Sequence, residues 1–199
     1  MMKSVNYLFV IGIASFAFAC GSGNNNSGEE TTMEDEMGRG DMMATEMETK
    51  SAVAILSGAS GSNVTGTATF TSLENGKVRL VMDVENLSPG EHALHLHENG
   101  DCSAADATSA GGHWNPTGDP HGKRGEDGYH SGDIDNMVVG DDGVGTLEME
   151  VEGWTIGDGS GSDIVNKAVI IHADADDFTS QPSGAAGARV ACGVIQAGS

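Results

Sequence analysis

The chain has 199 residues, a formal net charge of −21 at pH 7, 30 glycines, 4 prolines and only 5% aromatic residues. This length suits one domain of about 150 residues with appendages and is too short for two full-sized domains. The negative charge argues against nucleic acid or an anionic lipid surface as a partner, because both would repel the chain. The many glycines and few aromatic residues favour short strands and turns over helices.

The N-terminus has the pattern of an export signal. A short basic start is followed by the apolar run Val5–Phe18, which is too short for a comfortable membrane span, and then by Ala19 and Cys20. We expect a signal peptide at residues 1–19 with cleavage before Cys20. This arrangement resembles the bacterial lipoprotein signal, in which the new N-terminal cysteine is acylated, although Phe18 is bulkier than the residue usual there.

The alternative is ordinary secretion with Cys20 left as a free thiol. Either pathway places the mature protein outside the cytoplasm, in the periplasm or on the outer surface of a bacterial cell, where disulfides can form.

Residues 20–50 have the composition of an acidic, disordered linker. They show no apolar periodicity and contain eight acidic residues, with only Arg39 and Lys50 as basic ones. Thioethers are soft ligands, so a Cu(I)-binding tract is the alternative for the methionines of this segment. These are Met33, Met37, Met42, Met43 and Met47. Their irregular spacing and the lack of an accompanying histidine favour a plain linker.

From Ser51 onwards, apolar and polar residues alternate in short runs separated by turn sequences such as Asn75-Gly76 and Asp142-Gly143. No window shows an apolar stripe at helical period. Seven or eight strands at this spacing predict an all-β domain, an antiparallel sandwich or barrel. The candidate strands are Ser51–Leu56, Gly66–Leu73, Lys77–Glu85, His92–His97, Asn136–Val139, Gly145–Val151, Lys167–His172 and Arg189–Gln196.

Two long segments, Gly100–Asp135 and Asp174–Ala188, interrupt the strands. Loops of this length in a compact domain are usually functional. Six of the seven histidines lie between His92 and Asp133, so the first segment is the better candidate for a metal-binding loop.

The histidines fall into two groups. His95 and His97 point to one face of a strand, because residues two apart in a strand share a face, and His172 ends another strand. The loop supplies three imidazoles and one carboxylate, which is a full tetrahedral set for zinc. Those residues are His113, His121, His130 and Asp133. We expect His92 to be a packing residue rather than a ligand.

The spacing of these residues resembles that of the copper/zinc superoxide dismutases. The motifs are H-x-H at His95, H-W-N-P-x-x-x-x-H from His113, H-x-x-D from His130, a strand ending in His172, and A-R-V-A-C-G-V-I from residue 188. The resemblance covers about Ser51–Gln196, and several spacings match at once. It implies an eight-stranded antiparallel Greek-key β-barrel or sandwich, immunoglobulin-like, with two long functional loops in a domain of residues 51–199.

The resemblance also implies a role for each site residue. Copper would be bound by His95, His97, His113 and His172. Zinc would be bound by His113, His121, His130 and Asp133, so that His113 bridges the two ions, one of each per chain. Cys102 and Cys192 correspond to the intrachain disulfide of the family. Arg189 corresponds to the arginine beside copper, and Asp176 to the carboxylate between a copper ligand and a zinc ligand.

The implied activity is the disproportionation of superoxide to oxygen and hydrogen peroxide by Cu(II)/Cu(I) cycling. Zinc has no redox chemistry and would order the loop. His113 would leave the reduced copper, take a proton and pass it to the forming peroxide, while Arg189 would hold the anion by a charge-assisted contact.

The second long segment departs from the pattern of the familiar eukaryotic enzymes. It is shorter and lacks their channel lysine and glutamates, with Ser183 where threonine is usual and Pro182 near the usual lysine. Arg189 is therefore the cation expected near copper, and Lys123 and Arg124 are either substitutes or exposed surface charges. Any steering must be local, because charges beyond about 8–10 Å are screened at physiological salt.

Two functions are compatible with the sequence. One is an extracytoplasmic enzyme acting on the superoxide anion, and the other is a non-catalytic copper/zinc-buffering module on the same fold. A non-catalytic relative would be expected to lose a copper ligand or the arginine, so their presence favours the enzyme. Membrane contact is expected only through a lipid on Cys20. A homodimer is compatible with the sequence but is not specified by it.

Overall fold

Strand β3 (Val78–Glu85) illustrates how the alternating sequence forms the sheet in the computed structural model, which describes residues 48–198. Its apolar residues Val78, Leu80, Met82 and Val84 are buried, whereas the charged residues between them point outward. This period of two is the pattern of a strand with one face on the core. The expected signal peptide, Cys20 and the linker as far as residue 47 lie outside the described residues.

All eight expected strands are present, and two of them are divided. The run His92–His97 breaks at Ala93, where the chain changes its sheet partner, and Arg189–Gln196 breaks at Ile195. The strands are β1 (Ser51–Gly58), β2 (Thr65–Ser72), β3, β4 (Gly90–His92), β5 (Leu94–His97), β6 (Met137–Val139), β7 (Gly145–Val151), β8 (Ala168–His172), β9 (Arg189–Val194) and β10 (Gln196–Ala197).

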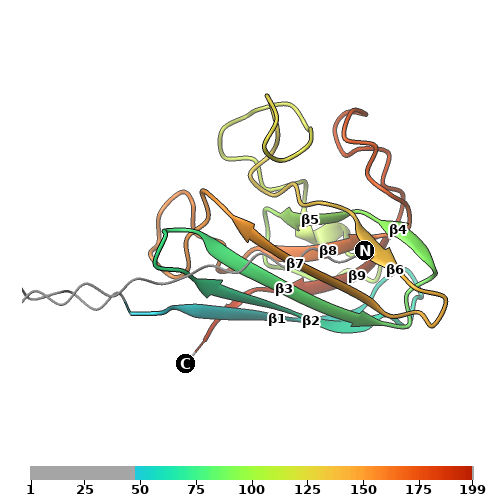
Figure 1. Ribbon diagram of the computed structural model, residues 1–199. Helices are drawn as coiled ribbons and strands as arrows, with labels where there is room; N and C mark the ends of the chain where they lie inside the picture. Colours follow the sequence, from blue (N-terminus) through green and yellow to red (C-terminus); the bar gives the residue numbers. More distant parts are fainter. Residues whose placement is uncertain (1–47, 199) are drawn as a thin grey trace, which may run out of the picture. The chain divides into compact units, whose positions relative to one another are not determined.

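The strands form one antiparallel sheet in the order β4-β6-β7-β3-β2-β1-β9-β8-β5, with β10 beside β1 (Figure 1). The two ends of this order, β4 and β5, are joined through the single residue Ala93, which closes the sheet into a barrel. The connection from β3 to β4 passes β7 and β6, a long-range link of Greek-key type. The prediction of an all-β antiparallel barrel is confirmed.

The core fills the inside of the barrel. It includes Phe70, Leu80, Leu94, Leu96 and Ile171. Strand β8 is buried along its whole length, and so is β5. These two strands therefore have cover on their outer face as well as on the core side, and the outer cover comes from the long loops.

The two long loops connect β5 to β6 and β8 to β9, as the sequence predicts. Beyond the strand ends they contain only the short 3₁₀ helix η1 (Thr108–Ala110). The histidine-rich part of the first loop and the whole second loop rise on the same side of the barrel (Figure 1). The expected disulfide between Cys102 and Cys192 is present and ties the first loop to β9 across 90 residues of sequence.

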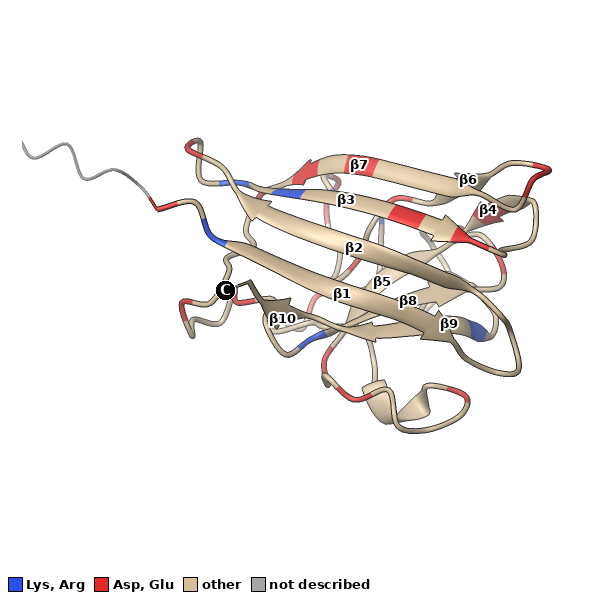
Figure 2. Ribbon diagram, turned by 90° about the horizontal axis from the view of Figure 1, so that it is seen from below, with Lys and Arg blue, Asp and Glu red and all other residues tan. Residues whose placement is uncertain are grey.

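Asp and Glu residues occur on β3, β4, β7 and in the loops, and Lys and Arg residues are few (Figure 2). Within residues 48–198, no helix has the length and apolar character needed to span a bilayer.

Candidate metal centre

Strands β5 and β8 hold three histidines on the outer face of the barrel. Leu94 and Leu96 point into the core, so the alternation of β5 turns His95 and His97 outward. In the antiparallel pairing His95 lies opposite Ile170 of β8, and His172 ends that strand. The rings of His95 and His172 are 5.0 Å apart, centroid to centroid.

The first loop returns along β5 and adds its own ligands there. The backbone N–H of Trp114 donates to the Leu96 carbonyl, and the N–H of Leu96 donates to the Gly132 carbonyl, both at 2.8 Å. This pairing places His113 beside His97 and Asp133 beside His95. A Cβ on Gly132 would lie 2.2 Å from the Leu96 carbonyl oxygen, so only glycine permits this close approach.

Four imidazole rings converge, and each has one nitrogen without a hydrogen-bond partner (a bare nitrogen) directed at the same position. One ring nitrogen from each of four histidines lies within 4.8 Å of the others. These histidines are His95, His97, His113 and His172. The buried nitrogens without a hydrogen-bond partner in these rings are His95 Nδ1, His97 Nε2, His113 Nε2 and His172 Nε2. Unpartnered buried polar atoms are costly, and converging ones fit a bound metal ion.

The other nitrogen of each ring is bound to the protein. His97 Nδ1 donates to the Gly111 carbonyl at 2.9 Å, and His172 Nδ1 donates to the Gly187 carbonyl at 3.2 Å. His95 Nε2 lies 2.8 Å from an oxygen of Asp176. A neutral imidazole that donates from one nitrogen has a lone pair on the other, so these contacts select the tautomer that can ligate a metal.

Asp133 is the centre of a second group. Its Oδ1 lies 2.9 Å from His113 Nδ1 and 3.4 Å from His130 Nδ1, and its Oδ2 lies 3.0 Å from His121 Nδ1. The His121 nitrogen is at hydrogen-bond distance without hydrogen-bond geometry. When a tetrahedral zinc ion has bonds of about 2.0–2.1 Å, any two of its ligand atoms lie about 3.3 Å apart. The distances from Asp133 to the three ring nitrogens are close to this value, so these donors fit zinc.

The centroids of the His113, His121 and His130 rings are 5.3–5.5 Å from one another. By the closeness of ligand atoms alone, His95 also falls near His113, His121 and Asp133. Since His95 Nε2 is bound to Asp176 and its Nδ1 belongs with the four bare nitrogens, we assign His95 to the first group. His113 is common to both groups, with Nδ1 facing Asp133 and Nε2 facing the other three rings.

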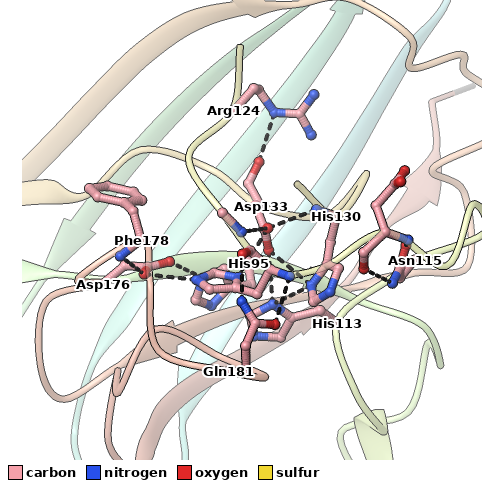
Figure 3. A network of polar contacts seen from close by, with 12 residues as sticks. His95, His113, Asn115, Arg124, His130, Asp133, Asp176, Phe178 and Gln181 are labelled. Carbon is pink, nitrogen blue, oxygen red and sulfur yellow. Dashed lines mark hydrogen bonds and ion pairs between the residues drawn. The ribbon is translucent and has the colours of Figure 1, made fainter. Parts of the chain in front are cut away.

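Asp176, from the second long loop, connects the groups a second time. Its Oδ2 contacts His95 Nε2 at 2.8 Å and its Oδ1 contacts His121 Nε2 at 2.9 Å (Figure 3). One carboxylate thereby orients one ring of each group.

A cleft of about 410 Å³ lies between the two loops and is lined by three of these four histidines, His97, His113 and His172. Among the described residues that line it, Arg189 is the only lysine or arginine. The guanidinium donates to the carbonyl oxygens of Ala107 (2.7 Å) and Gly111 (2.6 Å). The Gly111 carbonyl also accepts from His97, so one backbone group positions both the cation and a metal ligand.

The sequence matches the model of the copper/zinc superoxide dismutase family over residues 64–195. The chain belongs to this family. It is 38% identical to a copper/zinc superoxide dismutase of Deinococcus radiodurans over 147 residues, which are 67% of this chain and 78% of the relative. A copper/zinc superoxide dismutase of Caulobacter vibrioides is 37% identical over 151 residues, 73% of this chain and 86% of the relative.

Solved structures agree with this assignment. A superoxide dismutase-like protein from Bacillus subtilis matches with a TM-score of 0.65 and 32% identity, over 71% of this chain and 96% of the other. The clock protein EA4 matches with a TM-score of 0.66 and 33% identity, over 73% and 93% of the two chains. The protein is therefore an oxidoreductase that acts on superoxide, with copper and zinc as cofactors.

The two groups differ in charge. Burial lowers the pKa of His95 to about 4, of His97 to about 2 and of His172 to about 3, so these rings are neutral at pH 7. Burial would raise the pKa of Asp133 and Asp176, but hydrogen bonds from the histidines outweigh it and hold both below the usual value. Three neutral imidazoles, those of His95, His97 and His172, thus face the first position, and the ionised Asp133 lies at the second.

The structure also shows the contacts of His92, expected to be a packing residue, and of Arg124 and Lys123, whose roles the sequence left open. His92 bridges the carbonyl oxygens of Ser88 and His172 at 2.8 Å each, as a packing residue. Arg124 is neither a channel cation nor a surface charge. It is partly buried, donates to the Ser131 and Asp133 carbonyls, and lies 5.1 Å from the Trp154 ring. Lys123 lies over Phe178 and outside the cleft, so it does not substitute for the missing lysine.

We expect acid to destabilise the metal-free protein. The folded-state pKa values of His95, His97 and His172 lie below the ordinary 6.5, so the unfolded chain binds more protons as pH falls from about 6.5 to about 4. The free energy of unfolding should therefore decrease across that window. Chemical denaturation in the presence of a chelator measures it, and a His172→Gln variant should show a shallower slope.

The pKa of His121 is shifted in the opposite direction, so its effect on the pH dependence of stability is also opposite. Burial lowers its pKa, but the Asp133 and Asp176 carboxylates beside its two ring nitrogens outweigh this and raise it to about 9. Its contribution is complete below pH 6.5 and is lost as pH rises through about 9. Stability of the metal-free protein should thus be highest near pH 6.5, and an increase on acidification to pH 4.5 would contradict the argument.

Proposed function

We propose that the enzyme holds one copper ion and one zinc ion that share His113. Copper would be bound by His95, His97, His113 and His172. Zinc would be bound by His113, His121, His130 and Asp133. The observation that carries this proposal is the two-sided environment of His113, whose Nδ1 contacts Asp133 while its buried Nε2 has no partner.

When bound, copper supplies the one-electron chemistry, Cu(II) to Cu(I) and back, which zinc cannot supply. The protein supplies a proton and an anion site. Two superoxide anions and two protons give one O₂ and one H₂O₂. His113 Nε2 takes one of these protons in the first half of the cycle, while Nδ1 keeps the ring in place, and gives it to the second superoxide.

Arg189 holds the substrate. Its guanidinium lines the cleft beside His97, His113 and His172 and is fixed by the Ala107 and Gly111 carbonyls. Because the guanidinium is already fixed, it can make a charge-assisted contact with a small anion while losing little further conformational entropy. His95 and Asp176 do not line the cleft. His95 would bind copper from the buried side, and Asp176 orients the rings of His95 and His121.

Replacement of His113 tests the mechanism. The purified protein should contain one copper and one zinc per chain and show cyanide-sensitive dismutation. His113→Ala should lower the rate by about 100-fold or more, because a positioned proton donor contributes at least that much. Lys123→Ala, a change outside the cleft, is the control.

Unimpaired dismutation by His113→Ala at full copper content would contradict the proposed role of His113. One copper and one zinc per chain without any activity in the unchanged protein would support the non-catalytic buffering module instead.

The charge distribution predicts weak electrostatic steering. Arg189 is the one lysine or arginine among the described cleft residues, and the chain as a whole carries a net charge of −21. Attraction is thus confined to short range. The rate should change by far less than the roughly 10-fold or more that strong steering gives when salt rises from low to physiological. The measurement is the dismutation rate across an ionic-strength series, and a steep fall would refute the prediction.

We further propose that the enzyme is exported and attached to a membrane by a lipid on Cys20, with residues 20–50 as an acidic linker. The support is the sequence pattern at residues 1–20. In bacterial cells the full chain should partition with membranes, and Cys20→Ala should be released in soluble, active form. Membrane attachment of that variant at the level of the unchanged protein would exclude the lipid anchor.

A further inference from the structure

The second long loop contacts the backbone of a zinc-side histidine through one side chain. The His121 N–H donates to Gln181 Oε1 at 2.9 Å, and Gln181 Nε2 donates to the His121 carbonyl at 2.8 Å. The side-chain amide thus satisfies both backbone groups of a residue 60 positions earlier, as a neighbouring strand would. Figure 3 shows Gln181 directed at the histidine cluster.

The same histidine is held at its ring by the same loop. Asp176 Oδ1 contacts His121 Nε2 at 2.9 Å, which leaves Nδ1 facing Asp133 Oδ2 at 3.0 Å. Gly184 lies against this contact. A Cβ at Gly184 would be 1.7 Å from Asp176 Oδ1 and 2.7 Å from His121 Nε2, and its φ is +64°.

A reciprocal contact runs in the other direction. Asn136, at the end of the first loop, donates from Nδ2 to the Asp176 carbonyl at 3.0 Å and accepts the Asp176 N–H at 2.8 Å. The contact between His121 and Asp176 is therefore supported from both loops. Gln181 of the second loop binds the backbone of His121, and Asn136 of the first loop binds the backbone of Asp176. Backbone and side chain of both residues are fixed together.

No regular secondary structure orders the backbone at His121. It lies between Pro120 and Gly122 in a stretch without helix or strand. Without Gln181, the backbone at His121 would have to become ordered when the ion binds. The entropic cost of this ordering would lower the affinity for the ion.

We propose that Gln181 is a positioning residue for zinc, which makes zinc affinity depend on the second loop. This inference rests on the zinc ligand set proposed above. Gln181 does not contact the ion. It acts by fixing the backbone of His121, and through it the direction of Nδ1.

The test compares Gln181→Met, which keeps the length and bulk of the side chain without its hydrogen bonds, with Gln181→Ala. Gln181 is exposed, so neither change leaves a cavity in the core. Both variants should bind zinc about 10-fold more weakly, the lower range for loss of a group that orients a metal ligand. Competition with a chelator of known affinity measures the dissociation constant.

Ser180→Ala is the matched control. It removes a hydrogen bond to Asp177 within the same loop and touches nothing in the first loop. Its zinc affinity should equal that of the unchanged protein. Thermal unfolding with and without zinc separates positioning from general stability. In the Gln181 variants the metal-free melting temperature should stay close to that of the unchanged protein, while the increase on adding zinc becomes smaller.

Unchanged zinc affinity in Gln181→Met and Gln181→Ala would overturn the inference, and so would an equal drop in melting temperature with and without zinc. If the unchanged protein binds no zinc, the ligand assignment itself fails. These two failures are distinguished by the measurement on the unchanged protein.

Discussion

An imidazole has two nitrogens, and the metal centre depends on how each is used. In the first group, every ring gives one nitrogen to the protein and leaves the other bare and buried. The partners are backbone carbonyls for His97 and His172 and carboxylates for His95 and His113. Because each partner fixes a tautomer and a ring orientation, the four unpartnered nitrogens are held toward one position. The barrel supplies the positions, and the loops supply the partners.

The two groups differ in charge because they differ in what surrounds them. The outer face of β5 and β8 offers apolar cover and backbone dipoles, so its histidines stay neutral. The side of the first loop contains Asp133 and faces Asp176, and both are held ionised by the rings around them. In the proposed assignment, a divalent ion would replace the proton of His121 there at modest cost, whereas a copper ion among neutral imidazoles would keep more of its own charge for an anion. His113 joins these environments, so its role would differ from that of the other six proposed ligands.

The sequence predicted the candidate ligands better than the residues that orient them. Alternation in β3 and β5 gave the strand faces, and the spacing from His95 to Asp133 together with His172 and Arg189 gave the residues that the structure brings together. The breaks at Ala93 and Ile195 were not predicted, because alternation continues across them and only the change of pairing partner reveals them. Lys123 and Arg124 were left between two roles, since charge alone does not show whether a side chain is bound by nearby carbonyls.

Apart from Asp176, the contacts that orient the ligands were missed for a different reason. Gly111 and Gly187 act through carbonyl oxygens, which every residue possesses, so their identity carries no signal. Gln181 and Asn136 are ordinary loop residues until the two loops are seen side by side.

These missed contacts explain how a centre built largely from irregular loops can be precise. Backbone pairing holds the first loop along β5, and the disulfide holds it at Cys102. Gln181 and Asp176 hold it at His121. The second loop is pinned at Asp176 by Asn136. If zinc and copper bind as proposed, a change at the zinc position would reach copper by two routes, through the shared ring of His113 and through Asp176 to His95. Since Asp176 orients a ring in each group, loss of order at His121 would also loosen a ligand of the redox ion. On this view, zinc affects the chemistry by keeping His95 and His113 in place and takes no part in electron transfer.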